Sequence, residues 1–421
     1  MDTGHPPRVA RPGNATQVLL AFLKLGTTSF GGPIAHLGYF RREFVERRRW
    51  LDHGTYADLL ALCQFLPGPA SSQLGFSIGL VHAGWRGAFA AWLGFTLPSF
   101  LLMIAFAALA PTLGGPVGNG VVHGLKLAAV AVVAQAVWDM AHRLSADRPR
   151  AAIAVVAVVL LGVLTGRYAQ LIAIATGAAL GAVLCRERGG GAADVADAGR
   201  AAPPPAAVPV PASVPVSRRV GAIAFGLFCV LLIRVPSSGQ SAAAHAIALF
   251  DAFYRSGALV FGGGHVVLPL LQQRTVATGW VPPDVFLAGY GAAQALPGPL
   301  FTFGAYLGWV AQPEPHRLAG ALVATVAIFL PGLLLVIAAL PYWNALRRRP
   351  SMAAALAGVN AAVVGLLASA LYSPVWTSAV LSGVDFTVAV VAFALLTRWK
   401  APPLAVVAFC SAAGAAMALA H

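Results

Sequence analysis

The chain has 421 residues, of which 58% are hydrophobic and only 10% are charged. Soluble globular domains carry roughly 25% charged residues, so this composition excludes a soluble globular protein and indicates a polytopic membrane protein. The 28 Lys and Arg residues against 14 Asp and Glu leave a net charge of +14. Because the cations cluster between apolar segments, we assign them to cytoplasmic loops and expect no nucleic-acid partner.

A window of about 20 residues finds six apolar segments in the first half of the chain. They lie near residues 15–40, 56–82, 85–110, 118–141, 150–165 and 168–185. The polar, Gly- and Pro-rich stretch 186–217 is predicted to be a disordered linker. Seven segments follow, near 219–235, 243–271, 284–311, 318–341, 352–372, 383–397 and 402–420. We therefore expect an N-terminal tail (1–14), a first repeat (15–185), the linker, a linking transmembrane helix (218–236) and a second repeat (237–421).

Two motifs recur in the same order in both halves. The first runs Phe, cation, Gly and then Phe-Gly-Gly, at residues 22–32 and again at 253–263. The second is Leu-Pro-Gly-Pro, at residues 66–69 and 296–299, and in each copy a Trp and a Gln precede it at the same spacing. Two motifs that recur in the same order seldom arise by chance, so they predict an internal duplication.

The single linking helix places an odd number of crossings between equivalent points, so the second copy should be inverted. The loop cations agree, because they fall on opposite loops of the two copies. Arg143, Arg148 and Arg150 follow the fourth segment of the first half, whereas Arg347, Arg348 and Arg349 precede its counterpart. The fold class predicted is thus an all-α polytopic membrane protein with two inverted-topology repeats, its N-terminus cytoplasmic and its C-terminus outside.

The basic loop at residues 41–50 would face outward if the first two segments both crossed the membrane. Either both segments are re-entrant hairpins, broken at Gly31-Gly32-Pro33 and at Pro67-Gly68-Pro69, or this loop is an exception to the positive-inside rule. A Leu-Pro-Gly-Pro sequence cannot continue a helix, which favours the hairpins. The helix-breaking prolines are Pro33, Pro67, Pro69, Pro297 and Pro299.

Broken helices inside a bilayer are tolerated where they line a wet cavity, and their free N–H groups suit an anion. Inverted repeats that meet at such breaks are typical of alternating-access transporters. The candidate substrate-binding residues are the break glycines and the polar or cationic residues near them. They are Lys24, Gly31, Gly32, His36, Gln64, Gly68, Lys126, Arg255, Gly262, Gly263, His265, Gln294 and Gly298.

Each polar candidate also has a structural alternative. Lys24 and Arg255 occupy equivalent places inside apolar runs and could neutralise a dianion, or they could snorkel, with Arg255 paired to Asp251. Lys126, whose counterpart is Asn360, could tune one half-site or pack against a loop.

The histidine and glutamine candidates, and the two glutamates Glu43 and Glu46, also have both a functional and a structural interpretation. The histidines could donate to an oxyanion or carry a proton, and the glutamines could donate N–H groups, or all four could serve helix packing. Glu43 and Glu46 are expected to pair with nearby arginines, with Glu43 as a coupling carboxylate the alternative.

No phosphate loop, H-E-x-x-H motif, G-x-S-x-G elbow or carboxylate cluster is present, so we expect no enzyme, metal site or cofactor. The four cysteines stand apart within or beside apolar runs and are expected to pack in the core. An ion channel, or an intramembrane enzyme assembled from His36, Asp58 and His265, remains as an alternative class.

The two Phe-Gly-Gly blocks, Phe30 to His36 and Phe261 to His265, together with the two Leu-Pro-Gly-Pro blocks, resemble the two-domain form of the chromate ion transporter family. This resemblance covers nearly the whole chain. It implies gradient-driven export of chromate across the inner (cytoplasmic) membrane, hence chromate resistance, with sulfate as a competing or exchanged dianion. A sulfate or other oxyanion permease is the alternative, and a homo-oligomer is possible.

Overall fold

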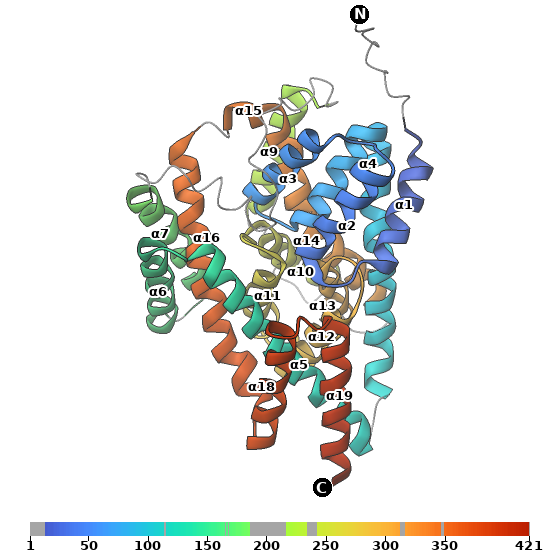
Figure 1. Cartoon of the computed structure of the whole chain (residues 1–421), viewed down its shortest axis with the longest axis vertical. Coiled ribbons are helices and arrows are strands. Elements are labelled where there is room, and N and C mark those ends of the chain that lie inside the picture. The colour runs from blue at the N-terminus through green and yellow to red at the C-terminus, as the bar shows by residue number, and fades with distance from the viewer. Residues whose placement is uncertain are drawn as a thin grey trace, which may run out of the picture.

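The computed structural model describes residues 13–112, 115–164, 166, 168–185, 216–233, 242–311, 316–346 and 349–420. These residues form helices joined by turns and contain no β-strand (Figure 1). The all-α prediction is therefore confirmed. The predicted linker at 186–217 lies outside the described residues, apart from its last two positions.

The helices of the first half follow the predicted apolar segments. Polar caps begin several of them: Asn14 accepts the N–H of Thr16 at α1, and Asp52 accepts the N–H of Thr55 at α3. The elements are α1 (Ala15–Thr28), α2 (Gly32–Phe40), the π-helix η1 (Arg41–Arg47), α3 (His53–Phe65), α4 (Ala70–Leu109), η2 (Ala110–Thr112), α5 (Gly115–Leu144), α6 (Arg148–Val163) and α7 (Ala169–Leu184).

The second half opens with α9 (Arg218–Leu232), which is capped by Ser217, and then repeats the order of the first half. Its elements are α10 (Ala242–Ala258), η4 (Gly264–Val266), α11 (Val267–Thr275), α12 (Pro283–Ala295), η5 (Leu300–Thr302), α13 (Phe303–Ala311), α14 (Arg317–Ala339), η6 (Leu340–Tyr342), α15 (Trp343–Leu346), α16 (Pro350–Ala370), η7 (Leu371–Trp376), α17 (Thr377–Ala379), α18 (Gly383–Thr397) and α19 (Pro403–Ala420).

Helix α4 folds back on itself near its middle. Ala83 and Gly84 have non-helical backbone angles there. A Cβ on Gly79 would lie only 2.3 Å from the carbonyl oxygen of Gly87, so the two arms pack in direct backbone contact. Gly308 of α13 and Gly320 of α14 make the same contact in the second half. The first arm of α4 is thus the counterpart of α13 and the second arm the counterpart of α14.

The first two apolar segments of the first half turn back at their breaks. Gly13, Trp50 and His82, which are far apart in sequence, meet at the end of these helices opposite the breaks. The N–H of Gly13 donates to the carbonyl of His82 over 3.0 Å, and the His82 ring stacks on Trp50 with centroids 3.9 Å apart. The chain therefore leaves this end along α1, returns along α2, leaves again along α3 and returns along the first arm of α4.

The second half closes its hairpins in the same way. His245 at the start of α10 lies 3.2 Å from the carbonyl of Ala311 at the end of α13, and its ring lies 5.4 Å from that of Trp280. Both halves thus have two successive hairpins, broken at Phe-Gly-Gly and at Pro-Gly-Pro. This arrangement is the hairpin alternative inferred from the basic loop at residues 41–50.

The two halves are intertwined through one long helix from each. Helix α5 of the first half packs against α18 and α19 of the second half, and α16 of the second half packs against α6 and α7 of the first (Figure 1). Glycines permit the close approach, because a Cβ on Gly124 would lie 2.2 Å from the Cys410 carbonyl and one on Gly358 would lie 2.1 Å from the Gly177 carbonyl. Neither half could bury these helices without the other.

Five helical stretches in the described part are long and apolar enough to cross a membrane: Ala70–Thr112, Gly115–Leu144, Arg317–Tyr342, Ser351–Ala379 and Pro403–Ala420. In the first of these, the arm after Gly84 supplies the length, about 37 Å at 1.5 Å per residue. Large apolar side chains also cover outer faces, as at Val163 (73% exposed) and Ile223 (70% exposed), which suits a lipid environment. Cys63 and Cys410 are buried as expected, but Cys229 is exposed.

Candidate functional site

The Phe-Gly-Gly and Pro-Gly-Pro breaks of the two halves converge. Gly264 follows the second Phe-Gly-Gly, and its Cβ position lies 3.1 Å from Cγ of Pro33, which holds the same place in the first. The N–H of Gly68 donates to the carbonyl of Val260 over 2.7 Å. Reciprocally, the N–H of Gly298 donates to the carbonyl of Ser29 over 3.0 Å. Each Pro-Gly-Pro turn is therefore hydrogen-bonded to the residue just before the Phe-Gly-Gly turn of the other half.

These reciprocal bonds correct one part of the sequence-based site. Gly68 and Gly298 were expected to offer their N–H groups to an anion, but both groups already donate to protein carbonyls. Their glycine identity has a structural reason, because φ is +124° at Gly68 and +95° at Gly298. In the described part of the chain, the N–H groups of the Phe-Gly-Gly glycines make no such backbone bond: Gly31, Gly32, Gly262 and Gly263.

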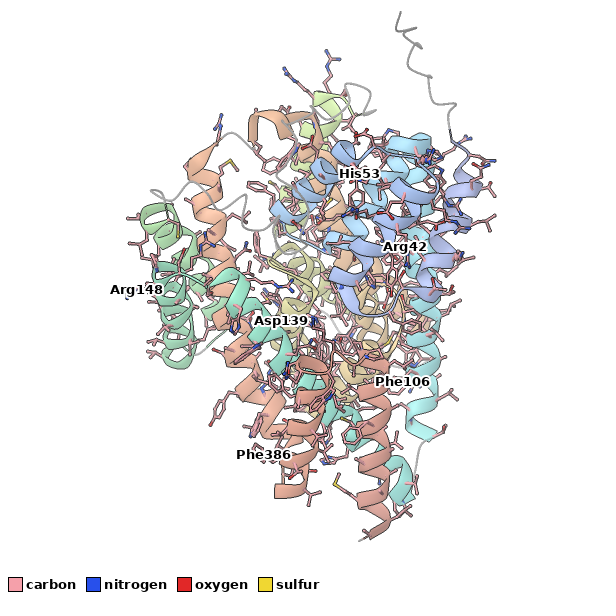
Figure 2. The ribbon with its side chains drawn as sticks, in the orientation of Figure 1. Arg42, His53, Phe106, Asp139, Arg148 and Phe386 are labelled. Carbon is pink, nitrogen blue, oxygen red and sulfur yellow. The ribbon has the colours of Figure 1, made fainter. Side chains whose placement is uncertain are left out.

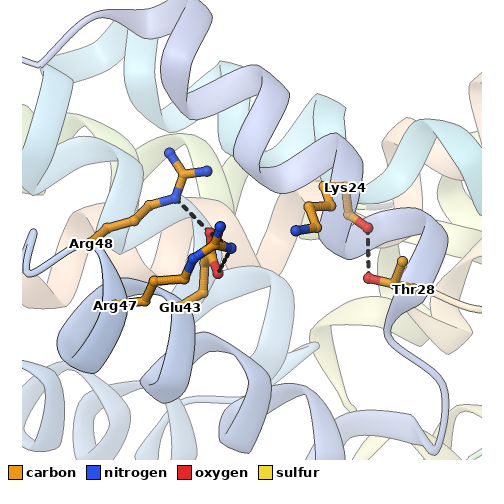
Figure 3. A network of polar contacts seen from close by, with 5 residues as sticks. All are labelled: Lys24, Thr28, Glu43, Arg47 and Arg48. Carbon is orange, nitrogen blue, oxygen red and sulfur yellow. Dashed lines mark hydrogen bonds and ion pairs between the residues drawn. The ribbon is translucent and has the colours of Figure 1, made fainter.

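A cavity of about 270 Å³ with several charged lining residues opens near the first Phe-Gly-Gly turn. It lies between α1 and the segment formed by α2 and η1, and Lys24 on α1 faces Glu43 and Arg47 across it (Figure 3). Figure 2 labels Arg42, one of the lining residues, in the upper half of the molecule and Phe386 near its lower end. The lining residues are Lys24, Leu25, Thr28, Tyr39, Arg42, Glu43 and Arg47.

Three cations and one carboxylate line this cavity, which leaves two positive charges. The carboxylate of Glu43 is already engaged, because it accepts from Nε of Arg48 at 2.6 Å and from Nη1 of Arg47 at 3.0 Å (Figure 3). Burial alone would raise the pKa of the Glu43 carboxyl, but the hydrogen bonds and charges of Arg48 and Arg47 hold the pKa below its ordinary value. An ionised Glu43 therefore stabilises this corner of the fold at neutral pH and ceases to do so as the pH falls through that lowered pKa.

A second pocket occupies the equivalent place beside the second Phe-Gly-Gly turn, and it is nearly closed, with a volume of about 10 Å³. Six of its lining residues belong to the second half, and each lies at the same sequence distance from Phe261 as a lining residue of the first cavity lies from Phe30. They are Arg255, Ser256, Leu259, Leu270, Gln273 and Arg274. Two residues of α7, Gln170 and Leu171, complete its lining. Nε2 of Gln170 donates to the Pro269 carbonyl, and Nε2 of Gln273 donates to the Gly166 carbonyl, each over 3.1 Å.

Lys24 and Arg255 are therefore not brought together around one ligand, because each lines the pocket of its own half. Lys24 is exposed, and the described residues place no ion-pair partner on it. Arg255 is tied instead: its Nε donates to Asp251 at 2.6 Å and its Nη2 to the Leu232 carbonyl at 2.7 Å. The pairing alternative considered for Arg255 is thus what the structure shows.

The other cationic candidate, Lys126, is also paired. Its Nζ donates to the carboxylate of Asp284 on α12 over 2.8 Å, and only 11% of its side chain is exposed. One turn earlier on α5, His123 lies 2.7 Å from the carboxylate of Asp385 on α18. Both contacts join α5 to the second half, so Lys126 holds the two halves together and does not line either pocket.

The histidine and glutamine candidates occupy different surroundings in the two halves. His36 is buried and its Nε2 donates to the Ser29 carbonyl at 3.2 Å, the same oxygen that accepts from Gly298. Nδ1 of His265 lies 3.0 Å from the hydroxyl of Tyr290. Gln64 is exposed, whereas Nε2 of Gln294 is buried without a hydrogen-bond partner in the described part. Of these, His36 belongs to the contact between the breaks.

The sequence reasoning missed Arg42, Arg47, Tyr39 and Thr28, which complete the open cavity. The two arginines had been assigned to the basic loop that reports topology. A usable signal was present, because the hairpin alternative already returns residues 39–47 toward α1. The expected salt bridges of this loop are confirmed: Glu43 with Arg47 and Arg48, and Glu46 with Arg41. The structure describes no group of His, Cys, Asp and Glu suited to a metal ion.

Comparison with known proteins identifies the family. The model of the chromate transporter family matches residues 16–182 and again residues 247–415, which together cover most of the chain. The chain belongs to the chromate transporter family. As a long-chain member with two such domains, this transporter is a multi-pass membrane protein of a family that is not enzymatic.

Named relatives of this transporter cover both halves. It is 31% identical to the chromate transport protein of Pseudomonas aeruginosa, over 86% of this chain and 80% of the relative. It is 29% identical to a probable chromate transport protein of Synechococcus elongatus, over 84% and 83% of the two chains. Identity to the chromate transport protein of Cupriavidus metallidurans is 27%, over 88% and 87%. No solved structure matches the chain.

Proposed function

We propose that this protein exports chromate across the cytoplasmic membrane as a gradient-driven carrier and thereby confers chromate resistance. The observation that carries this proposal is the open cavity of about 270 Å³ beside the first Phe-Gly-Gly turn. Its three cations and one carboxylate leave two positive charges, which match a tetrahedral dianion. The names of the relatives supply the identity of that dianion.

The carrier mechanism we propose is alternating access between inverted repeats. Supporting it, the hairpin helices α12 and α13 of the second half lie below α1, α2 and α3 in Figure 1. The backbone bonds between the breaks are reciprocal, as a two-fold relation requires. One pocket is open while its counterpart is closed. On this proposal the hairpins are re-entrant, the N-terminus is cytoplasmic and the C-terminus is outside.

In the revised binding scheme, the dianion enters the open cavity and contacts Lys24, Arg42 and Arg47. Gly31 and Gly32 lie at the turn that follows Thr28, one of the lining residues, and among the described residues their N–H groups donate no bond of the kind made by Gly68 and Gly298. Gly68 and Gly298 hold the two halves together in place of binding the anion. Arg255 takes part only in the opposite state, when its own pocket opens. In this scheme the two repeats that move against each other are residues 15–185 and 237–421.

Sulfate is the second candidate substrate, by exchange or competition. Chromate and sulfate share charge and shape, and the cavity offers cations and hydroxyl groups that recognise both. Preloaded sulfate should accelerate chromate movement through a carrier but not through a channel. A comparison of chromate, sulfate, molybdate and phosphate, with and without a pH gradient, ranks the substrates.

The test of the proposed function is Lys24→Gln in everted vesicles supplied with labelled chromate. Loss of a charge-assisted contact costs about 1.5–3 kcal/mol, so saturable uptake should fall at least about tenfold. Lys400→Gln is the matched control, because it makes the same change at an exposed lysine outside the cavity. Equal transport by Lys24→Gln and Lys400→Gln would remove Lys24 from the site.

A further inference from the structure

Glu43 is the single carboxylate among the residues that line the open cavity. It is bonded to Arg47, a cation that an entering anion would also contact. Its Oε2 accepts from Nη1 of Arg47 at 3.0 Å, and its Oε1 accepts from Nε of Arg48 at 2.6 Å. Arg47 lines the cavity, whereas Arg48 does not. A dianion bound to Arg47 would therefore sit against the carboxylate, and two like charges at hydrogen-bond distance disfavour each other strongly.

We propose that Glu43 couples anion binding to a proton: a dianion that takes Arg47 is bound together with a proton on the Glu43 carboxyl. The proton is taken up from hydronium in the bulk solvent, which leaves a water molecule, and forms an O–H bond on the carboxylate, so the cavity gains the anion and loses one negative charge of its own. A protonated Glu43 keeps an acceptor oxygen for Arg48 and gains a donor that can face the anion. This inference rests on the proposed function.

The geometry favours Glu43 over other groups as the proton site. Its side chain is only 11% exposed, so water screens its repulsion from the anion poorly. Several other titratable side chains besides the arginines lie on the surrounding elements, and of these only Lys24 and Tyr39 line the cavity. They are Lys24 on α1, His36 and Tyr39 on α2, Glu46 on η1, His53, Tyr56, Asp58 and Cys63 on α3, and His82 on α4. Lys24 and Tyr39 line the cavity with Glu43, but neither is a carboxylate whose negative charge a bound anion would repel. His82 stacks on Trp50, outside the lining.

The second half contains a natural contrast. The residue at the place of Glu43 is Arg274, and that of Arg42 is Gln273. The second pocket thus has no carboxylate at this position, and a proton taken up in the first cavity has no equivalent site there. Coupling would belong to one half only, so the transporter would be asymmetric in its proton chemistry although its backbone is duplicated.

The test is the affinity of the purified full-length protein for sulfate, whose charge stays at minus two between about pH 5 and pH 8. In the wild type, the dissociation constant should fall as the pH falls, by up to about tenfold per pH unit if one proton is bound. Glu43→Gln should bind sulfate with little dependence on pH, and Glu43→Asp should retain the dependence.

Glu46→Gln is the matched control, since Glu46 lies on the same π-helix but pairs with Arg41, outside the cavity, with about half of its side chain exposed. It should behave as the wild type does. A wild-type affinity that is constant with pH, or a pH dependence that persists in Glu43→Gln, would overturn the coupling and leave the proposed function standing. Failure of the wild type to bind either sulfate or chromate at any pH would overturn the dianion site on which both proposals rest.

Discussion

The two pockets beside the Phe-Gly-Gly turns are built from equivalent positions and yet differ in state. The first, around Lys24, is open at about 270 Å³, and the second, around Arg255, has closed to about 10 Å³. One difference in sequence and one in packing accompany this. Asp251 stands one turn before Arg255 and binds it, whereas Leu20 holds that place before Lys24 and cannot. In addition, α7 covers the second pocket through Gln170, and no residue of its counterpart α19 lines the first.

The comparison teaches that duplication fixes where the pockets lie but not what they do. A cation at the same place has no ion-pair partner among the described residues in one half and belongs to a partly buried ion pair in the other. On the proposed alternating-access mechanism one pocket is open while the other is closed, and the differing partners of Lys24 and Arg255 would give each pocket its own balance between these states.

The largest expected effect on the comparison comes from Arg255→Gln. This change leaves Asp251, whose side chain is 18% exposed, and the Leu232 carbonyl without their partner. An unsatisfied group of this kind costs about 1–3 kcal/mol, so thermal unfolding in detergent should occur at a lower temperature. Asp251→Asn combined with Arg255→Gln should recover part of the loss.

Lys24→Gln provides the contrast to that measurement. Because Lys24 is exposed, its replacement should change the free energy of unfolding by less than about 0.5 kcal/mol while it impairs transport. If Lys24→Gln proved as destabilising as Arg255→Gln, the two cations would share one structural role and the comparison would fail.

A smaller effect is expected from Gln170→Leu, which removes the bond of 3.1 Å that holds α7 across the second pocket. One hydrogen bond contributes about 1 kcal/mol, so the open state of this pocket should become about fivefold more populated. The readout is the labelling rate of Leu259→Cys by a charged thiol reagent. Gln17→Leu, at an exposed position on α1, is the control. An unchanged rate would mean that α7 is not the cover.

Much of the fold was predictable because its signals are local. Glycine and proline in Phe-Gly-Gly and Leu-Pro-Gly-Pro end helices wherever they occur, and the structure ends α1 at Thr28 and α3 at Phe65 accordingly. The hairpins were one of two explanations considered for the unusual placement of a basic loop, the other being an exception to the positive-inside rule. The fold-back of α4 at Gly84 was anticipated only as a boundary between two segments, near residues 82–85.

The site was less predictable, because its decisive contacts join distant parts of the chain. Nothing near Gly68 in sequence reveals that its N–H donates to Val260, or that Gly298 donates to Ser29 in return. Lys24 stood out because a cation is costly in an apolar run. Arg42 and Arg47 did not, because arginines in a polar loop are common, and only the return of that loop onto α1 makes them part of a cavity.

The most direct test of alternating exposure uses two cysteines in a variant whose four native cysteines are replaced by serine. Thr28→Cys reports on the first pocket and Leu259→Cys on the second, each labelled by a membrane-impermeant thiol reagent from either face of the vesicle. We expect Thr28→Cys to react from one face and Leu259→Cys only from the other, with substrate gradients slowing one reaction as they speed the other. Reaction of both cysteines from the same face, with rates that rise and fall together, would contradict the account.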